Sequence, residues 1–284
     1  MNIINGETVN KKFHWFHPKS ILDKITPRYK NKLLPGWVAK YSTKHFLNKR
    51  EEDEYIFNLS TQPEDWHYRT KKVIYNINSD GYRTGELSTL TPEIIKNSII
   101  LFGCSLTFGS SVAEDETIGH HLKMLTGKNV INLGVPSSSI YFNTVNSFLF
   151  YKLFGIPYSI VYIWTTLDRD LIFNKTSVAH VGPWNCSEVS TKYTVDPIQT
   201  NYFDSFNYDE INANARGMFN SMMAKSFWED KCKLVMGSFF EQTAHFTNSN
   251  LVFSNDKKAR DLLHSGSGSN YNAAEKIAKF MGEI

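Results

Sequence analysis

The chain has 284 residues, of which 41% are apolar and 21% charged, and its net charge is +3. These values are typical of a soluble globular protein with one sizeable core and an extension, or with two modest domains. No stretch approaches the roughly 20 apolar residues that span a bilayer, no secretory signal is evident, and three scattered cysteines do not make a disulfide framework. We therefore expect a cytoplasmic protein that folds in a reducing compartment.

The amino-terminal part of the chain is strongly basic. Residues 1–50 contain eleven Lys or Arg against two acidic residues, a local balance of +9 that leaves the rest of the chain at −6. Trp15 and Trp37 lie among the basic residues, a composition compatible with an acidic partner, an acidic polysaccharide or nucleic acid, although nothing indicates base reading. The alternative, which we favour, is a solvated extension whose aromatic residues pack on the main domain. We predict an extension over residues 1–75, with an exposed acidic linker at Glu51–Glu54.

The apolar run Ser98–Phe102 predicts a strand that is buried on both faces. It leads into Gly103-Cys104-Ser105-Leu106-Thr107-Phe108-Gly109, where Gly103 allows a sharp turn. Ser105 would then stand at the carboxyl edge of a sheet, where open α/β folds bind ligands. Adjacent residues of extended backbone point to opposite sides, so Cys104 is expected to face the interior and is the weaker candidate nucleophile.

The remaining apolar runs alternate between strand and helix patterns. This alternation predicts a mostly parallel, flavodoxin-like sheet with helices on both faces, a three-layer α/β/α sandwich. A long segment with little periodicity, at about 174–207, is interpreted as an insertion that covers the active site. The further strands are predicted at 129–133, 160–164, 233–239 and 251–253, and the helices at 117–125, 138–153, 209–228 and 271–281.

Asp261 and His264 lie three residues apart, directly before the Gly/Ser-rich segment 265–269. One turn of backbone can bring both side chains to the same side. A carboxylate that fixes the tautomer of an imidazole allows that imidazole to deprotonate a serine such as Ser105. A surface hydrogen-bonded pair without catalytic meaning is the competing interpretation.

These elements together resemble the SGNH (GDSL-like) hydrolase family over about residues 76–284. The segment 103–109 is similar to the family's first block, with Cys104 in place of the usual aspartate, and it is preceded by Asn78-Ser79-Asp80-Gly81-Tyr82-Arg83, similar to an Asn-x-x-Gly-[Phe/Tyr]-Arg element. The segment 130–136 resembles the second block, and Asp261-x-x-His264 the last. The resemblance implies a Ser105–His264–Asp261 triad, an oxyanion hole formed by the amides of Ser105 and Gly134, and no metal or organic cofactor.

One block of that family is missing. The usual Gly-x-Asn-Asp would fall near Thr165-Thr166-Leu167-Asp168-Arg169-Asp170, and alignment on either aspartate puts Leu167 or Arg169 where the oxyanion-binding asparagine should stand. Thr165, Thr166 or Arg169 could replace that donor. Arg169 would also suit an anionic substrate, although a solvated arginine is an equal alternative.

We expect a serine esterase that removes a small acyl group, most plausibly O-acetyl from a carbohydrate. Two alternatives stay open: a carbohydrate O-acyltransferase, and a catalytically weak binding or structural module of a larger assembly. The partner is expected to be a small ester or acylated saccharide. The histidines and cysteines outside the triad show no metal-ligand spacing, and nothing predicts a membrane span or sequence-specific nucleic-acid binding.

Overall fold

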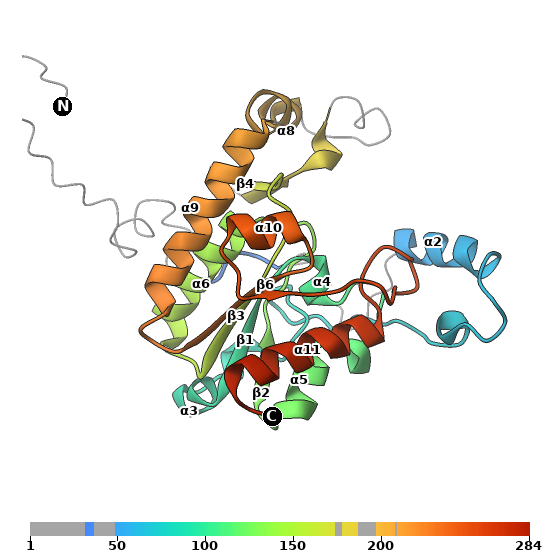
Figure 1. Ribbon diagram of the computed structural model, residues 1–284, viewed down its shortest axis with the longest axis horizontal. Coiled ribbons are helices and arrows are strands. Elements are labelled where there is room, and N and C mark those ends of the chain that lie inside the picture. The colour runs from blue at the N-terminus through green and yellow to red at the C-terminus, as the bar shows by residue number, and fades with distance from the viewer. Residues whose placement is uncertain (1–31, 37–48, 174–177, 187–196, 208) are drawn as a thin grey trace, which may run out of the picture.

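The computed structural model describes residues 32–36, 49–173, 178–186, 197–207 and 209–284 (Figure 1). Most of the basic segment 1–50, including Trp15 and Trp37, lies outside the described residues, as do residues 174–177 and 187–196 of the predicted insertion. The expected acidic partner at the amino terminus therefore stays a prediction. No helix of the described ranges is both long and apolar enough to cross a bilayer.

A parallel sheet of five strands forms the centre of the molecule. Its spatial order is β2-β1-β3-β6-β7, and each neighbouring pair runs parallel. All six residues of both β1 and β3 are buried, which explains why these strands read as continuous apolar runs. The strands are β1 (Ser98–Gly103), β2 (Asn129–Asn132), β3 (Ser159–Trp164), β6 (Lys233–Ser238) and β7 (Leu251–Val252).

Helices cover both faces of this sheet, α6 (Ile140–Phe154) and α9 (Glu210–Trp228) on one, α5 (Ile118–Thr126) and α11 (Ser267–Met281) on the other (Figure 1). Successive residues of a strand point to opposite faces. Accordingly Phe102 packs in the apolar cluster that includes α6 and α9, whereas its neighbour Leu101 packs in the cluster of α5 and α11. The predicted three-layer α/β/α fold is confirmed.

Polar residues begin the helices at the predicted places. The side chain of Thr117 accepts a hydrogen bond from the His120 amide at the start of α5, and Ser139 does the same for Phe142 at the start of α6. Shorter helices complete the described chain: α3 (Pro92–Lys96), α4 (Ser105–Phe108), α8 (Pro197–Tyr202), α10 (Glu241–Phe246), a π-helix (Phe203–Asn207), and 3-10 turns at His67–Arg69, Leu87–Thr89, Glu114–Glu116 and Pro183–Asn185.

Three expectations about local structure were wrong. The acidic stretch Glu51–Glu54 is part of the helix α2 (Lys49–Leu59) and is not a linker, because Glu52 pairs with the buried Arg260. Helix α11 begins at Ser267, so most of the Gly/Ser-rich segment forms its first turn. An antiparallel hairpin, β4 (Asp170–Phe173) with β5 (Val178–Val181), lies where no strand was predicted.

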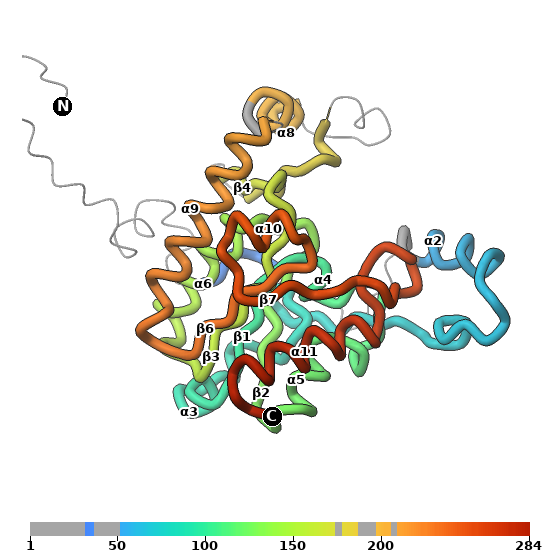
Figure 2. Tube along the Cα trace, in the orientation of Figure 1, coloured from blue at the N-terminus to red at the C-terminus, as the bar shows by residue number. Residues whose placement is uncertain are grey.

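The segment before β1 packs closely on the main domain. Tyr68 is buried in one small cluster with Val112 and Ala259, and Tyr75 in another with Phe108. Figure 2 shows α2 beside the loop that precedes α11, and Asn58 of this helix donates to the Arg260 carbonyl. These contacts join residues 49–75 to the main domain, whereas the domain division at residue 75 stays a prediction.

Candidate active site

Ser105 lies at the carboxyl end of β1, where the chain turns from strand to helix. Cys104 is extended, and Ser105 is the first residue of α4. A Cβ atom on Gly103 would approach Thr107 Oγ1 to 2.0 Å and the Ile163 carbonyl oxygen to 2.6 Å, so only glycine fits between this helix and β3. Gly109, with φ of 84°, ends α4 in the left-handed conformation.

The structure brings Ser105, His264 and Asp261 into one hydrogen-bonded chain, although Ser105 and His264 are 159 residues apart in sequence. His264 Nε2 lies 2.9 Å from Ser105 Oγ, and His264 Nδ1 lies 2.5 Å from Asp261 Oδ2. The second carboxylate oxygen of Asp261 accepts the amides of Leu263 and His264, each at 3.0 Å. Leu262, with φ of 59°, provides the tight turn that places acid and base on the same side.

The electrostatics of this chain keep Asp261 ionised. Burial alone raises the pKa of Asp261, but the hydrogen bond and charge of His264 and the two amides outweigh it and lower the pKa to about 2. An ionised carboxylate only accepts hydrogen bonds, so His264 carries its proton on Nδ1 and presents the lone pair of Nε2 to the Ser105 hydroxyl. The Asp261 side chain is 1% exposed and that of His264 27%, which leaves the imidazole accessible.

Cys104 is 1% exposed and therefore turned away from the surface where Ser105 stands. Ser105 is half-buried and hydrogen-bonded to the imidazole. Of the two adjacent candidate nucleophiles, only the serine has a base within reach. Cys104 packs among buried residues like a small apolar side chain.

Gly134, predicted to join the oxyanion hole, has a different partner in this structure. Its N–H donates to Asn132 Oδ1 at 2.9 Å, and Asn132 Nδ2 in turn donates to the Thr107 carbonyl at 2.8 Å. A Cβ atom at Gly134 would lie 2.6 Å from the Phe108 amide nitrogen, so this loop packs directly against α4. The predicted role requires the Gly134 amide to be shared with Asn132 or released by it, and stays a prediction.

The sequence carries a local signal for this engagement that our prediction did not use. An asparagine side chain often accepts the amide two residues further on, which is the spacing of Asn132 and Gly134. The Ser105 amide differs, because as a first-turn donor of α4 it has no acceptor within its helix.

The three residues proposed to replace the missing asparagine lie in different surroundings. Thr165 is fully buried, and its hydroxyl has no hydrogen-bond partner among the residues that the structure describes. Thr166 lines a cavity, as described below. The guanidinium carbon of Arg169 lies 5.5 Å from the centre of the Trp184 ring, and its Nε and Nη1 are buried without a hydrogen-bond partner in the described part of the chain. Because β1 and β3 are paired up to Gly103 and Ile163, Thr165 follows β3 one strand away from Ser105.

A cavity of about 660 Å³ lies beyond the carboxyl ends of β3 and β6. Its lining is largely apolar, with carboxylates from Asp168 and Glu210, and the described residues that line it include no Lys, Arg or His. Neither Ser105 nor His264 lines it. The lining residues are Thr166, Leu167, Asp168, Pro183, Cys186, Phe203, Glu210, Ala213, Asn214, Phe240, Gln242 and Thr243.

Histidine and cysteine side chains outside the triad do not form a metal centre in the described ranges, where no group of three or more His, Cys, Asp or Glu could hold an ion. His180 is one example: burial, and then the charge of Arg169, lower its pKa to about 4, and its ring packs on Phe142. Burial also raises the pKa of Cys232 to about 11, which keeps this thiol protonated.

Comparison with known proteins finds distant similarity among solved structures. No family model and no curated protein matches this sequence. Among solved structures, the chain is similar to a protein of Desulfitobacterium hafniense DCB-2 whose name assigns it to the lipolytic G-D-S-L family, with 9% identity over 65% of this chain and 99% of the other, and a TM-score of 0.35. A likeness this distant carries no argument about chemistry, so the case for a function depends on the geometry described above.

Proposed function

We propose that this protein is an SGNH-type serine esterase in which Ser105 is the nucleophile, His264 the general base and Asp261 the residue that orients the base. The observation that carries the proposal is the chain of two hydrogen bonds from Asp261 through His264 to Ser105. Two separate segments of sequence supply these groups, and the serine stands where an open α/β sheet binds its ligands.

In the proposed reaction, His264 Nε2 takes the proton of the Ser105 hydroxyl as the serine oxygen forms a bond to the ester carbonyl carbon. The resulting imidazolium is stabilised by ionised Asp261. His264 then returns the proton to the leaving alcohol as its bond to carbon breaks, which leaves an acyl group on Ser105. A water molecule, deprotonated by the same imidazole, attacks this acyl group and releases the acid.

The negative oxygen formed in these steps needs hydrogen-bond donors. We assign the amide of Ser105 to this role, together with the Gly134 amide once it is shared with or released by Asn132. Thr165 is the strongest replacement for the missing asparagine, because it follows the neighbouring strand and no described residue forms a hydrogen bond with its buried hydroxyl. Each such donor contributes on the order of a hundredfold in rate.

We propose a neutral acylated saccharide as substrate, with an O-acetyl group as the part removed. The support is a cavity that lies at the same edge of the parallel sheet as Ser105 but is lined by neither Ser105 nor His264. Its apolar wall with scattered polar side chains suits a sugar ring next to the reacting ester, while Asp168 and Glu210 disfavour a negatively charged ligand. Arg169, which would have suited an anion, does not line the cavity.

One observation favours a second candidate function, a binding module with little or no activity. The Gly134 amide is engaged by Asn132, and the asparagine that usually binds the oxyanion is missing. The transition-state oxyanion therefore has fewer hydrogen-bond donors than an efficient esterase needs, although the three proton-transfer groups are in place. An acyltransferase would share the same acyl-enzyme, and product analysis with an added sugar acceptor separates it from an esterase.

Labelling with a serine-directed fluorophosphonate, combined with hydrolysis of short-chain aryl esters and acetylated saccharides, tests the proposal. We expect the label on Ser105, no label or hydrolysis in Ser105→Ala, and strong loss of both in His264→Ala. The exposed Ser60→Ala is the matched control and should behave as wild type. A folded protein that is not labelled would favour the binding module, and loss of activity in Cys104→Ala with retention in Ser105→Ala would contradict the assigned nucleophile.

A further inference from the structure

The loop that follows the nucleophile helix, residues 109–113, controls the backbone of Ser105. The amides of Gly109 and Ser110 both donate to the Ser105 carbonyl, at 2.9 and 3.0 Å. Two of its residues have positive φ, 84° at Gly109 and 63° at Ser111, and for serine this conformation is unfavourable. A loop in this conformation persists only where surrounding groups hold it, so the neighbours of residues 109–113 bear on the nucleophile.

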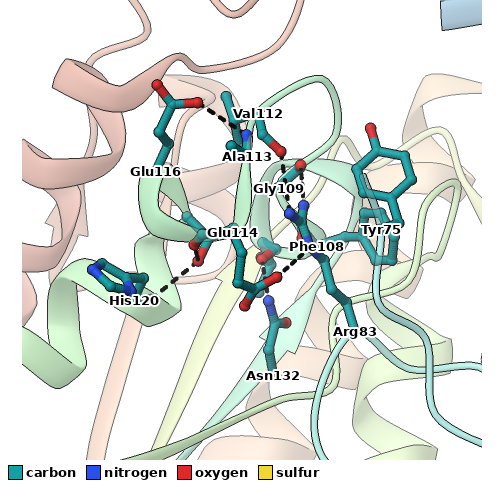
Figure 3. A network of polar contacts seen from close by, with 12 residues as sticks. Tyr75, Arg83, Phe108, Gly109, Val112, Ala113, Glu114, Glu116, His120 and Asn132 are labelled. Carbon is teal, nitrogen blue, oxygen red and sulfur yellow. Dashed lines mark hydrogen bonds and ion pairs between the residues drawn. The ribbon is translucent and has the colours of Figure 1, made fainter. Parts of the chain in front are cut away.

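Arg83 is the first of these neighbours. Its guanidinium donates to the carbonyls of Gly109 at 2.6 Å and Val112 at 3.1 Å, and its Nε donates to the Glu114 carboxylate at 2.8 Å (Figure 3). The residue is 2% exposed, so these contacts are screened little by water. A planar group with several fixed donors can bridge carbonyls at both ends of the loop, which the single ammonium of a lysine cannot do.

Tyr75 is the second neighbour. Its hydroxyl accepts the amide of Ser111, the strained residue, at 2.7 Å. Its ring packs edge-on against Phe108 with centroids 5.2 Å apart, and the guanidinium carbon of Arg83 lies 4.8 Å from the centre of the same ring. Tyr75 and Arg83 therefore form one buried unit, and the hydrogen bonds given above join it to residues 109–114.

The same loop also contacts the segment that carries the acid and base. The Ser111 carbonyl accepts the amide of Arg260, directly before Asp261, at 3.5 Å. Val112 packs with Ala259 in one small buried cluster. Residues 109–113 thus lie between the nucleophile and the Asp261–His264 turn, and a shift of this loop would move both.

We propose that Arg83 and Tyr75 are positioning residues for the reaction of Ser105: they hold residues 109–113 so that the serine hydroxyl stays within hydrogen-bonding distance of His264. This inference rests on the proposed function. Neither residue touches the reacting atoms, and both act through the loop. Because a misplacement of about 1 Å can cost roughly a hundredfold in rate, a small relaxation of the loop is enough for a large kinetic effect.

The test compares Tyr75→Phe with Tyr82→Phe. Both remove the hydroxyl of a buried, hydrogen-bonded tyrosine, but the hydroxyl of Tyr82 donates to the Leu34 carbonyl and accepts from Asn146, and neither partner belongs to residues 109–113. We expect Tyr75→Phe to lower kcat and the rate of fluorophosphonate labelling about tenfold per folded molecule with unchanged KM, and Tyr82→Phe to lower thermal stability without changing either rate.

Substitution of Arg83 should lower the labelling rate more than Tyr75→Phe does. Arg83→Lys should lower the labelling rate about a hundredfold, since lysine cannot bridge the two carbonyls. In Arg83→Ala, added guanidinium ion, far below concentrations that unfold the protein, should restore part of the rate, whereas an alkylammonium ion of similar size should not. A residue that only stabilised the fold would show no such rescue of folded protein.

The outcomes separate the two proposals. If wild-type Ser105 is labelled but folded Tyr75→Phe is labelled at the wild-type rate, the positioning role is wrong and the esterase proposal stands. If the two tyrosine variants lose rate equally, the effect is general destabilisation and the positioning role is again wrong. If wild-type Ser105 is not labelled, the esterase proposal itself fails.

Discussion

The two halves of the candidate site differ in how complete they are. In the proton-transfer half, Asp261, His264 and Ser105 already form a continuous hydrogen-bonded chain. In the oxyanion half, the Gly134 amide is bound to Asn132, and residues 165–170, directly after β3, include no asparagine. Activation of the serine and stabilisation of the oxyanion are therefore separate requirements of ester hydrolysis, and this site meets the first more completely than the second.

Substitution of Asp261, in the proton-transfer half, should have the largest effect on kcat. Asp261→Asn keeps the shape of the side chain but presents an amide to His264 Nδ1, which favours the wrong tautomer of the imidazole. We expect kcat for an aryl acetate to fall by about 10⁴-fold. Asp170→Asn, a buried carboxylate paired with Arg216 and Tyr202, is the control and should affect mainly stability. A loss of less than about tenfold in Asp261→Asn would exclude a working triad.

Probing the incomplete half should give a smaller effect. Thr165→Val removes a buried hydroxyl that has no partner within the described ranges, so the free energy of unfolding should stay the same or rise. If this hydroxyl binds the oxyanion, kcat should nevertheless fall by about a hundredfold. In the control Thr247→Val, the lost hydroxyl is bonded to the Thr243 carbonyl, so stability should fall while kcat stays unchanged. Unchanged kcat in Thr165→Val would assign the donor role elsewhere.

Lowering the pH should protonate Asp261 and thereby lower the free energy of unfolding gradually. The pKa of Asp261 is lowered from 3.8 to about 2, so the folded state binds this proton less readily than the unfolded state. The resulting stabilisation, roughly 2 kcal/mol, is fully present above pH 4 and is lost as the pH falls toward 2. Chemical unfolding across this range should show that loss in wild type and in the exposed control Asp65→Asn. A wild-type curve parallel to that of Asp261→Asn would contradict the assignment.

Much of the fold was predictable because its signals are local. The apolar runs at β1 and β3 and the helical spacing of α5, α6 and α9 fixed the order of elements, and the boundaries agree within a few residues. Where the predictions failed, distant partners decided. The sequence around Glu52 indicates a solvated acidic stretch, but in the folded chain Glu52 pairs with Arg260, which is 208 residues away.

The site shows the same division. Glycine at 103 and the three-residue spacing of Asp261 and His264 indicated a strand-end serine and an acid–base pair. The sequence did not indicate Tyr75 or the partners of Arg83, because the carbonyls that this arginine holds lie 26 and 29 residues further along and meet it only through folding.

By itself, the sequence determined the alternation of strands and helices, the turn at Ser105 and the pairing of acid with base, since each depends on residues close together in the chain. The tertiary structure alone brings the imidazole to the serine, engages the Gly134 amide, and packs Tyr68, Tyr75 and Arg83 on the loop beside the nucleophile. These depend on distances between segments far apart in sequence, which packing and burial set and which no local pattern encodes.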